Sequence, residues 1–192
     1  MRIIGGTFKG KKLISIRGAA IRPTADRVKE SIFNILATQI PGASVLDFFA
    51  GTGALGIEAL SRGAENAVFI DSSTSAVKTI QKNIIACRAD TRARVIRWDI
   101  FKNMNCLQPE FPAYDLVFMD PPYNKNIIGP TIKNLIKRNV LKSSATIIIE
   151  HSITEPIPDG LSGIELTDQR TYGKTLVSFL TVVLQKNLAG TL

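Results

Sequence analysis

Residues Val45 to Gly56 read VLDFFAGTGALG, an apolar run followed by a glycine-rich turn and a second apolar segment. The glycines have the spacing G-x-G-x-x-G, and Asp71 follows Gly51 by twenty residues. Glycine lets the backbone turn sharply and approach a ligand closely, and an acid at that distance can accept the ribose hydroxyls of an adenosine cofactor. This stretch therefore predicts a strand, a tight turn and a helix start, but it does not distinguish a dinucleotide from another adenosine cofactor.

Segments of strand length and helix length alternate on both sides of this turn. The predicted strands are 44–48, 66–71, 93–98, 115–119, 145–149, 164–167 and 176–184. The predicted helices are 24–39, 54–61, 75–88 and 127–140. Such alternation indicates an α/β fold in which a mostly parallel, seven-stranded sheet is covered by helices on both faces.

The first forty residues carry most of the net positive charge. They hold eight Lys or Arg and two Asp or Glu, against a net charge of +8 for the whole chain. Segments 2–8 and 11–16 predict a small basic β-hairpin extension, and we expect residues 1–40 to pack on a main domain of residues 41–187. The local excess suits a polyanion such as nucleic acid. The alternative is a solvated basic surface.

Length and composition favour one globular domain. The chain has 192 residues, of which 45% are hydrophobic and 21% charged. Its most apolar stretch, 175–184, is half the roughly 20 residues that a membrane span needs, and the N-terminus lacks the apolar core of a signal peptide. Cys87 and Cys106 form no CxxC pattern, so we expect reduced thiols, no metal site and a cytoplasmic location.

Four carboxylates accompany the predicted strands: Asp47, Asp71, Asp99 and Asp120. The carboxyl ends of parallel strands converge on the ligand crevice of such a sheet. Four acids there would repel the pyrophosphate of a dinucleotide, whereas S-adenosylmethionine carries a sulfonium and an α-amino cation. The pattern favours S-adenosylmethionine, although each Asp taken alone has the alternative of a helix cap or turn residue.

Residues 116–123 read LVFMDPPY, a predicted strand followed by an acid and two prolines. An exocyclic base amine is a poor nucleophile because its lone pair is delocalised into the ring, so an enzyme must hold it with acceptors. The Asp120 carboxylate and the Pro121 carbonyl could be those acceptors, on a loop that two prolines stiffen. Tyr123 offers a face for an unstacked base. The segment predicts an N-methyltransferase of a nucleic-acid base; the alternative is an ordinary proline turn.

Together the two motifs resemble the amino-methyltransferases of DNA, RNA and protein glutamine, which combine an F-x-G-x-G loop with Asp- or Asn-Pro-Pro-Tyr. Three more segments are similar to the RsmD family of bacterial small-subunit rRNA guanine-N2 methyltransferases: RIIGG at 2–6, RPTADRVKESIFN at 22–34 and YGKT at 172–175. The resemblance runs from Arg2 to about Leu180. It implies a Rossmann-like class I S-adenosylmethionine-dependent methyltransferase, with one guanine of 16S rRNA in the small ribosomal subunit as target.

Carried onto this chain, the resemblance assigns roles to individual residues. The implied cofactor-binding residues are Asp47, Phe49, Gly51, Gly53, Asp71 (ribose), Ser72, Asp99 (adenine), Ile100 and Asp120. The implied catalytic residues, which would hold the target base, are Asp120, Pro121, Pro122 and Tyr123. A monomer that uses neither a metal nor a membrane is expected. The tail reads RTY at 170–172, and a departure from the family there would affect RNA contacts, not chemistry.

Weaker candidates complete the set. The residues predicted to contact RNA are Lys9, Lys11, Lys12, Arg17, Arg22, Thr24 and Arg27, with a plain helix cap as the alternative for Thr24. His151 is expected to be structural, because an acceptor loop needs no imidazole base. Trp98 is expected to be a buried anchor, with packing near adenine as its alternative.

Three rival functions remain open. They are the same chemistry on adenine N6 of DNA or on another RNA, a non-catalytic RNA-binding assembly factor, and an NAD-dependent oxidoreductase. The intact glycine loop and Asp120 disfavour the assembly factor, and the strand-end acids disfavour the oxidoreductase.

Overall fold

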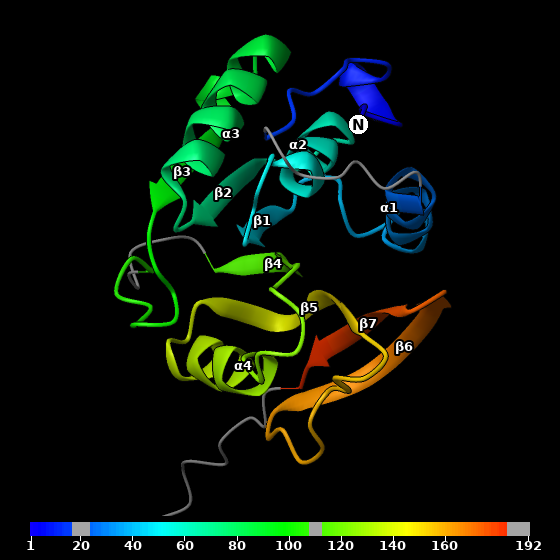
Figure 1. Ribbon diagram of the computed structural model, residues 1–192, viewed down its shortest axis with the longest axis vertical. Coiled ribbons are helices and arrows are strands. Elements are labelled where there is room, and N and C mark those ends of the chain that lie inside the picture. Colours follow the sequence, from blue (N-terminus) through cyan, green and yellow to red (C-terminus); the bar gives the residue numbers. More distant parts are fainter. Residues whose placement is uncertain (17–23, 108–112, 184–192) are drawn as a thin grey trace, which may run out of the picture.

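Seven strands form one sheet, with helices against it, in the computed structural model (Figure 1), which describes residues 1–16, 24–107 and 113–183. The strands are β1 (Ser44–Phe48), β2 (Asn66–Asp71), β3 (Ala93–Arg97), β4 (Tyr114–Met119), β5 (Leu141–Ser152), β6 (Ile164–Tyr172) and β7 (Thr175–Val182). The helices are α1 (Thr24–Ile35), α2 (Ala54–Ser61), α3 (Thr74–Cys87) and α4 (Ile128–Lys137), with 3₁₀ turns η1 (Gly6–Phe8) and η2 (Asp90–Arg92).

The strand order is β3-β2-β1-β4-β5-β7-β6. Neighbouring strands from β3 to β5 are parallel, whereas β7 runs antiparallel to both β5 and β6. The chain thus moves from β1 outward to β3 and then crosses to β4 on the other side of β1. Ligands of open α/β sheets bind at such a reversal, outside the carboxyl ends of the strands. The prediction of a mostly parallel, seven-stranded Rossmann-like sheet is confirmed.

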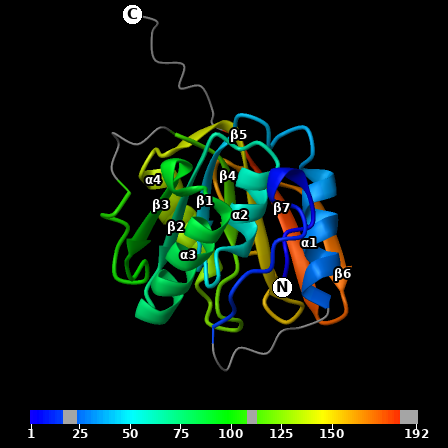
Figure 2. The same ribbon diagram turned by 90° about the horizontal axis from the view of Figure 1, so that it is seen from above.

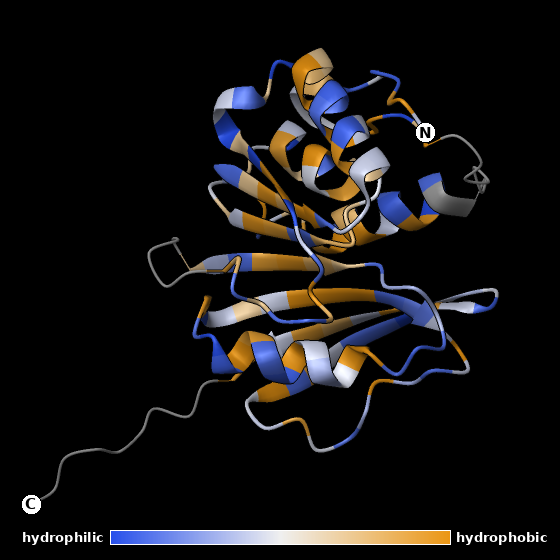
Figure 3. Cartoon of the chain, turned by 60° about the vertical axis from the view of Figure 1, so that its left-hand side comes forward, coloured by the Kyte–Doolittle hydropathy of each residue, from blue (hydrophilic) through white to orange (hydrophobic). Residues whose placement is uncertain are grey.

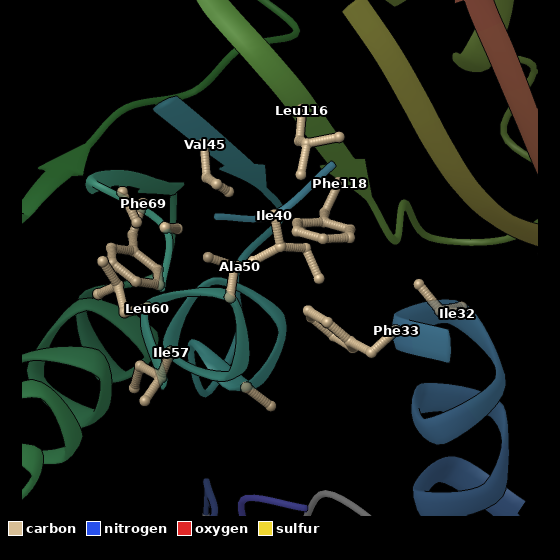
Figure 4. Close-up of a cluster of buried hydrophobic side chains, with 14 of the residues drawn as sticks. Ile32, Phe33, Ile40, Val45, Ala50, Ile57, Leu60, Phe69, Leu116 and Phe118 are labelled. Carbon is tan, nitrogen blue, oxygen red and sulfur yellow. The ribbon is translucent and has the colours of Figure 1, made fainter. Parts of the chain in front are cut away.

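Alternate residues of the strands enter two cores, one on each face of the sheet. In β4, Leu116 and Phe118 join a core with α1, α2 and α3, whereas Val117 and Met119 join a core with α4. Figure 4 shows the first core, where Phe33 of α1 lies against Phe118 with 5.5 Å between ring centroids. The central strands are hydrophobic along most of their length, while the helices alternate between polar and apolar residues (Figure 3). Helices on both faces therefore bury the sheet, as predicted.

The N-terminal arm, residues 1–16, folds back on itself but forms no regular strands. One antiparallel bridge joins Arg2 to Lys12, and η1 lies between them. The hairpin predicted from segments 2–8 and 11–16 is thus reduced to a single bridge. The reason is that the arm directs backbone groups toward α2: Ile4 N and Gly5 N donate to the Glu58 carboxylate at 2.9 and 2.8 Å.

Steric contact with α2 explains the glycine at the centre of the arm. Gly6 has φ +73°, and a Cβ there would lie 1.8 Å from the carbonyl oxygen of Ser61. No other residue fits this position without displacing α2. A second attachment lies further along, where Asn83 of α3 accepts from Ile14 N and donates to both Ile14 O and Thr52 O. The arm is therefore packed against the sheet domain and reaches the glycine loop.

Several boundaries differ from the predictions. Strand β5 spans Leu141–Ser152 instead of 145–149, and α4 covers Ile128–Lys137 instead of 127–140. Helix α1 ends at Ile35 instead of Gln39, because the next residues form tight turns, with Ala37 N bonded to Asn34 O and Gln39 N to Leu36 O. Strand β6 continues to Tyr172, so most of the predicted connector 169–174 belongs to the strand. Among the described helices, none has the length and apolar character to cross a membrane.

Candidate active site

The glycine loop follows β1 at the carboxyl edge of the sheet. Gly51 and Gly53 have φ of +55° and +77°, and Phe49 adopts a positive φ of 56° although it has a side chain. A Cβ on Gly56 would lie 2.3 Å from the Phe69 ring, so this glycine lets α2 pack closely on β2. The loop conformation therefore depends on residues that tolerate the left-handed region.

Asp71 at the end of β2 holds the glycine loop. Its Oδ2 accepts from Gly51 N at 2.9 Å, and its Oδ1 accepts from Ser73 N at 2.8 Å. An ionised carboxylate has about four lone-pair sites, so each oxygen keeps one for a further donor. Asp71 can thus fix the loop and accept ribose hydroxyls at the same time.

One pocket brings together five of the predicted cofactor residues. It is lined by Phe49, Ile70, Asp71, Ser72, Trp98, Asp99, Ile100 and Phe101. Carboxylates for a ribose and apolar side chains for a purine fit an adenosine. The pocket holds only about 10 Å³, space for one water, so an adenosine does not fit without a movement of its lining. The rings of Phe49 and Phe101 lie 5.4 Å apart in this lining, and Phe101 is 53% exposed on a turn.

Trp98 differs in part from its prediction. It is half-buried and lines this pocket, and its indole N–H donates to the carbonyl of Asn103 at 3.0 Å. Trp98 also packs against the core that contains α4, so the expected anchor is confirmed in part, as a half-buried one. Packing of Trp98 near the adenine stays a prediction.

Asp47 lies inside β1 and is buried, not open to the crevice. Its Oδ2 accepts from Gly56 N at 2.9 Å, which supports the start of α2. Burial raises the pKa of Asp47 to about 8, and the charges of Asp120 and Asp71 add to the increase, against the lowering by Gly56 N–H. Three of the four predicted carboxylates are thus close together. A contact between Asp47 and the cofactor stays a prediction.

The segment DPPY begins immediately after β4. Because β1 lies between β2 and β4, Asp71 and Asp120 flank the glycine loop from opposite sides. Asp120 is exposed and Pro121 is buried. Tyr123 Oη donates to Glu150 at 2.8 Å and lies 3.4 Å from the Thr175 hydroxyl. Burial raises the pKa of Tyr123 above its ordinary value, so the phenol stays protonated and anchored.

Glu155, which the sequence analysis missed, clamps the chain directly after Tyr123. Its carboxylate accepts from Asn126 N at 2.7 Å and from Asn124 N. Both asparagines have positive φ, of 57° and 54°, a conformation that Asn tolerates better than most residues. Glu155 is only 7% exposed. The only local indication in the sequence was the pair of asparagines; their partner lies about thirty residues away.

His151 supports this clamp from the core. It is fully buried, and its ring nitrogens lie 2.8 Å from the Glu155 carbonyl and the Ser178 hydroxyl. Both nitrogens are thus engaged within the protein. The prediction that His151 is structural is confirmed.

The residues predicted to contact RNA fall into three groups. Lys9, Lys12 and Arg27 are exposed. Lys11 is also exposed, but its ammonium donates to the carbonyl of Ala86 at 2.9 Å and lies over the Phe8 ring. Arg17, Arg22 and the side chain of Thr24 lie outside the described residues.

Comparison with known proteins gives consistent matches over nearly the whole chain. Residues 1–181 match the family model described as Conserved hypothetical protein 95. The chain is 37% identical over 174 residues to Ribosomal RNA small subunit methyltransferase D of Escherichia coli K12, covering 91% of this chain and 86% of that protein. The protein of the same name from Haemophilus influenzae is 36% identical over 159 residues, covering 82% and 81%.

Solved structures of methyltransferases also match the fold of this chain. That of yhhF from Escherichia coli superposes with a TM-score of 0.85 and 34% identity, covering 96% of this chain and 99% of that one. SMU.776, solved in complex with SAH, has a TM-score of 0.65 at 16% identity and covers 80% of this chain and 49% of that one. At that identity the likeness concerns the fold alone.

Proposed function

This chain belongs to the Conserved hypothetical protein 95 family, the RsmD family of rRNA methyltransferases, and from this premise we propose that it methylates the exocyclic N2 of one guanine in 16S rRNA. The observation that carries the proposal is the position of Asp120, exposed at the end of β4, beside a glycine loop whose other flank is the Asp71 pocket. The substrate class follows from the relatives named small-subunit methyltransferases. The choice of N2 follows from the resemblance to the RsmD family.

S-adenosylmethionine is the cofactor, and it supplies an electrophilic methyl group on a sulfonium. Asp71 would accept the ribose hydroxyls while it holds Gly51. Asp99, Ile100 and Phe49 would surround the adenine, and Asp120 faces the cofactor from β4. The negative charge of the crevice suits a cationic cofactor and opposes a pyrophosphate.

The loop Asp120–Tyr123, called the acceptor loop, would hold the target amine. The Asp120 carboxylate and the Pro121 carbonyl would accept the two N–H groups of guanine N2, which turns the nitrogen lone pair toward the methyl donor. As the nitrogen bonds to the methyl group it becomes positively charged, so its N–H groups donate more strongly to these acceptors, which favours the transition state over the ground state. The Asp120 carboxylate would then take the departing proton. Glu155 and Glu150 hold the loop through Asn124, Asn126 and Tyr123 and so fix the geometry in advance.

The role of Asp71 is tested by replacement with Ala. We expect the dissociation constant of S-adenosylmethionine to rise about 10- to 100-fold, since a hydrogen bond to a charged group contributes roughly 1.5–3 kcal/mol. Calorimetry with the cofactor and with NAD measures both affinities. Asp90→Ala is the matched control and should bind as wild type. Asp90 is exposed and precedes β3, at the amino ends of the strands, away from the carboxyl ends where Asp71 lies. Equal binding by Asp71→Ala, or a preference for NAD, would overturn the cofactor assignment.

The N-terminal arm is tested through Lys9 and Lys12, since Lys11 already binds the carbonyl of Ala86. If both ammonium groups contact phosphates, Lys9→Gln/Lys12→Gln raises KM for the ribosomal substrate. The slope of log KM against log salt concentration should become smaller by about 1.4, because each phosphate contact on a single strand contributes about 0.7.

The matched control is Lys133→Gln/Lys137→Gln on α4, which packs on the other face of the sheet from α2, to which the arm is attached. Rates at two salt concentrations for the three proteins decide the role of the arm. If the arm variant and the control behave alike, the arm is a solvated surface.

A further inference from the structure

Helix α1 lies beside the end of β6, at the edge of the sheet that the antiparallel strands add (Figures 1 and 2). Residues of both elements line a shallow groove of about 680 Å³ that is wide open to solvent. It is lined by Arg27, Glu30, Ser31, Asn34, Ile35, Arg170, Thr171 and Tyr172. Of these, Arg27 was among the predicted RNA contacts, and residues 170–172 form the tail segment whose departure from the family was expected to affect RNA contacts.

A series of contacts links the groove to the loop Asp120–Tyr123. Tyr172 pairs with Thr175 across the β6–β7 turn, and the Thr175 hydroxyl lies 3.4 Å from the hydroxyl of Tyr123. On its other side, Tyr172 donates a hydrogen bond to the hydroxyl of Ser31 on α1. One chain of contacts therefore leads from Tyr123, through Thr175 and Tyr172, to Ser31. These contacts link the groove to the loop that carries Asp120.

The groove presents the guanidinium groups of Arg27 and Arg170 at its surface. Arg27 is exposed, and Arg170 is 56% exposed in its side chain and pairs only with Asp168, at 3.0 Å, among the contacts described. An exposed ion pair of this kind is worth about 0–1 kcal/mol, so a phosphate can displace it. Glu30 is the one acid in the lining. Guanidinium groups bind phosphate oxygens in a bidentate fashion, which suits them to a nucleic-acid backbone.

The rest of the lining suits bases. Ile35 and the ring of Tyr172 provide apolar surface, and Ser31, Asn34 and Thr171 provide hydrogen-bonding groups. Base-aromatic stacking tolerates any sequence and requires unpaired bases, whose faces a duplex would hide. The lining is thus suited to a single strand.

We propose that this groove binds the single-stranded RNA segment adjoining the target guanine, with Arg27 and Arg170 on its phosphates. The proposal rests on the proposed function, because it places the segment next to a base held at Asp120. It assigns to the RTY segment at 170–172 a role in substrate binding and none in chemistry.

The test uses Arg27→Gln/Arg170→Gln in the full chain. Binding of a fluorescent single-stranded RNA should weaken at least fivefold, and the log–log salt slope should flatten by about 1.4. KM for small ribosomal subunits should rise, with kcat and cofactor affinity unchanged. Arg27→Lys/Arg170→Lys keeps both charges and should retain the wild-type slope. Lys133→Gln/Lys137→Gln on α4 is the surface control, and an unchanged thermal midpoint shows that each variant is folded.

Failure of the groove proposal and failure of the proposed function would give different results. RNA binding and KM that match wild type in the Gln variant would overturn the groove proposal, as would tighter binding of duplex than of single-stranded RNA. If the groove variants lose RNA binding but wild type methylates no ribosomal RNA, the groove stands and the proposed function fails. If wild type methylates subunits and the Gln variant does so with equal KM, the function stands and the groove fails.

Discussion

Asp120→Ala is expected to lose methyl transfer by about 100- to 10,000-fold, the contribution typical of a group that takes up a proton at the reacting centre. The variant removes the acceptor at the end of β4, while the Asp71 pocket and the glycine loop stay intact. Cofactor affinity should therefore stay within a few-fold of wild type. Single-turnover transfer of labelled methyl to small subunits, beside calorimetry with the cofactor, measures both quantities.

A second substitution at the same position tests what the acceptor does. Asp120→Asn keeps a carbonyl oxygen that can accept one N–H but cannot take a proton as a carboxylate does. It should fall between wild type and Asp120→Ala, and Asp90→Ala should match wild type. Near-normal turnover of Asp120→Ala would remove Asp120 from the mechanism.

Glu58→Ala is expected to cost about 3–5 kcal/mol of unfolding free energy, the usual effect of breaking a buried ion pair by removing one partner. Glu58 is fully buried and accepts from Lys29 at 3.2 Å and from Arg62 at 2.9 Å, besides the two backbone groups of the arm. Burial lowers the pKa of Lys29, and Glu58 raises it in opposition. Without Glu58, two backbone N–H groups lose their acceptor, and the buried Lys29 ammonium loses its counter-charge while it keeps its hydrogen bond to the carbonyl of Arg2.

Urea unfolding of three proteins tests this ion pair. Glu65→Ala, an exposed acid beside α2, should change stability by less than about 0.5 kcal/mol. Lys29→Met/Glu58→Leu removes both charges and should recover part of the loss, but not all, because Ile4 N and Gly5 N stay without their acceptor. A loss below 1 kcal/mol for Glu58→Ala would mean that water replaces the carboxylate and that the arm is not held by it.

The parts of the fold that could be predicted are those in which burial determines the side-chain pattern. Strands β1 and β2 and helix α2 have the predicted boundaries, because parallel strands buried on both faces are continuous apolar runs between turn residues. The edge strand β6 has no such pattern. Most of its residues are exposed, and its length is set by backbone hydrogen bonds to β7, which do not require a particular type of side chain.

The same distinction applies to the site. Asp71, Asp99 and Asp120 follow strands, so their meeting at one edge could be expected from topology. Glu155 and Glu58 could not be assigned in this way, because the backbone N–H groups from which they accept are 29 or more residues away. Asp47 differs from these three aspartates: it lies within β1 and accepts from the first turn of α2, a burial that its place in the motif did not indicate.

The central claim is methylation of guanine N2 in 16S rRNA, and one measurement tests it directly. Purified protein and labelled S-adenosylmethionine are supplied to small ribosomal subunits from a strain that lacks the modification, and the labelled nucleoside is identified and mapped. The proposed function predicts N2-methylguanosine at a single position of 16S rRNA, with no label after Asp120→Ala. Label on another base, on guanine outside 16S rRNA, or equal labelling by Asp120→Ala would contradict it.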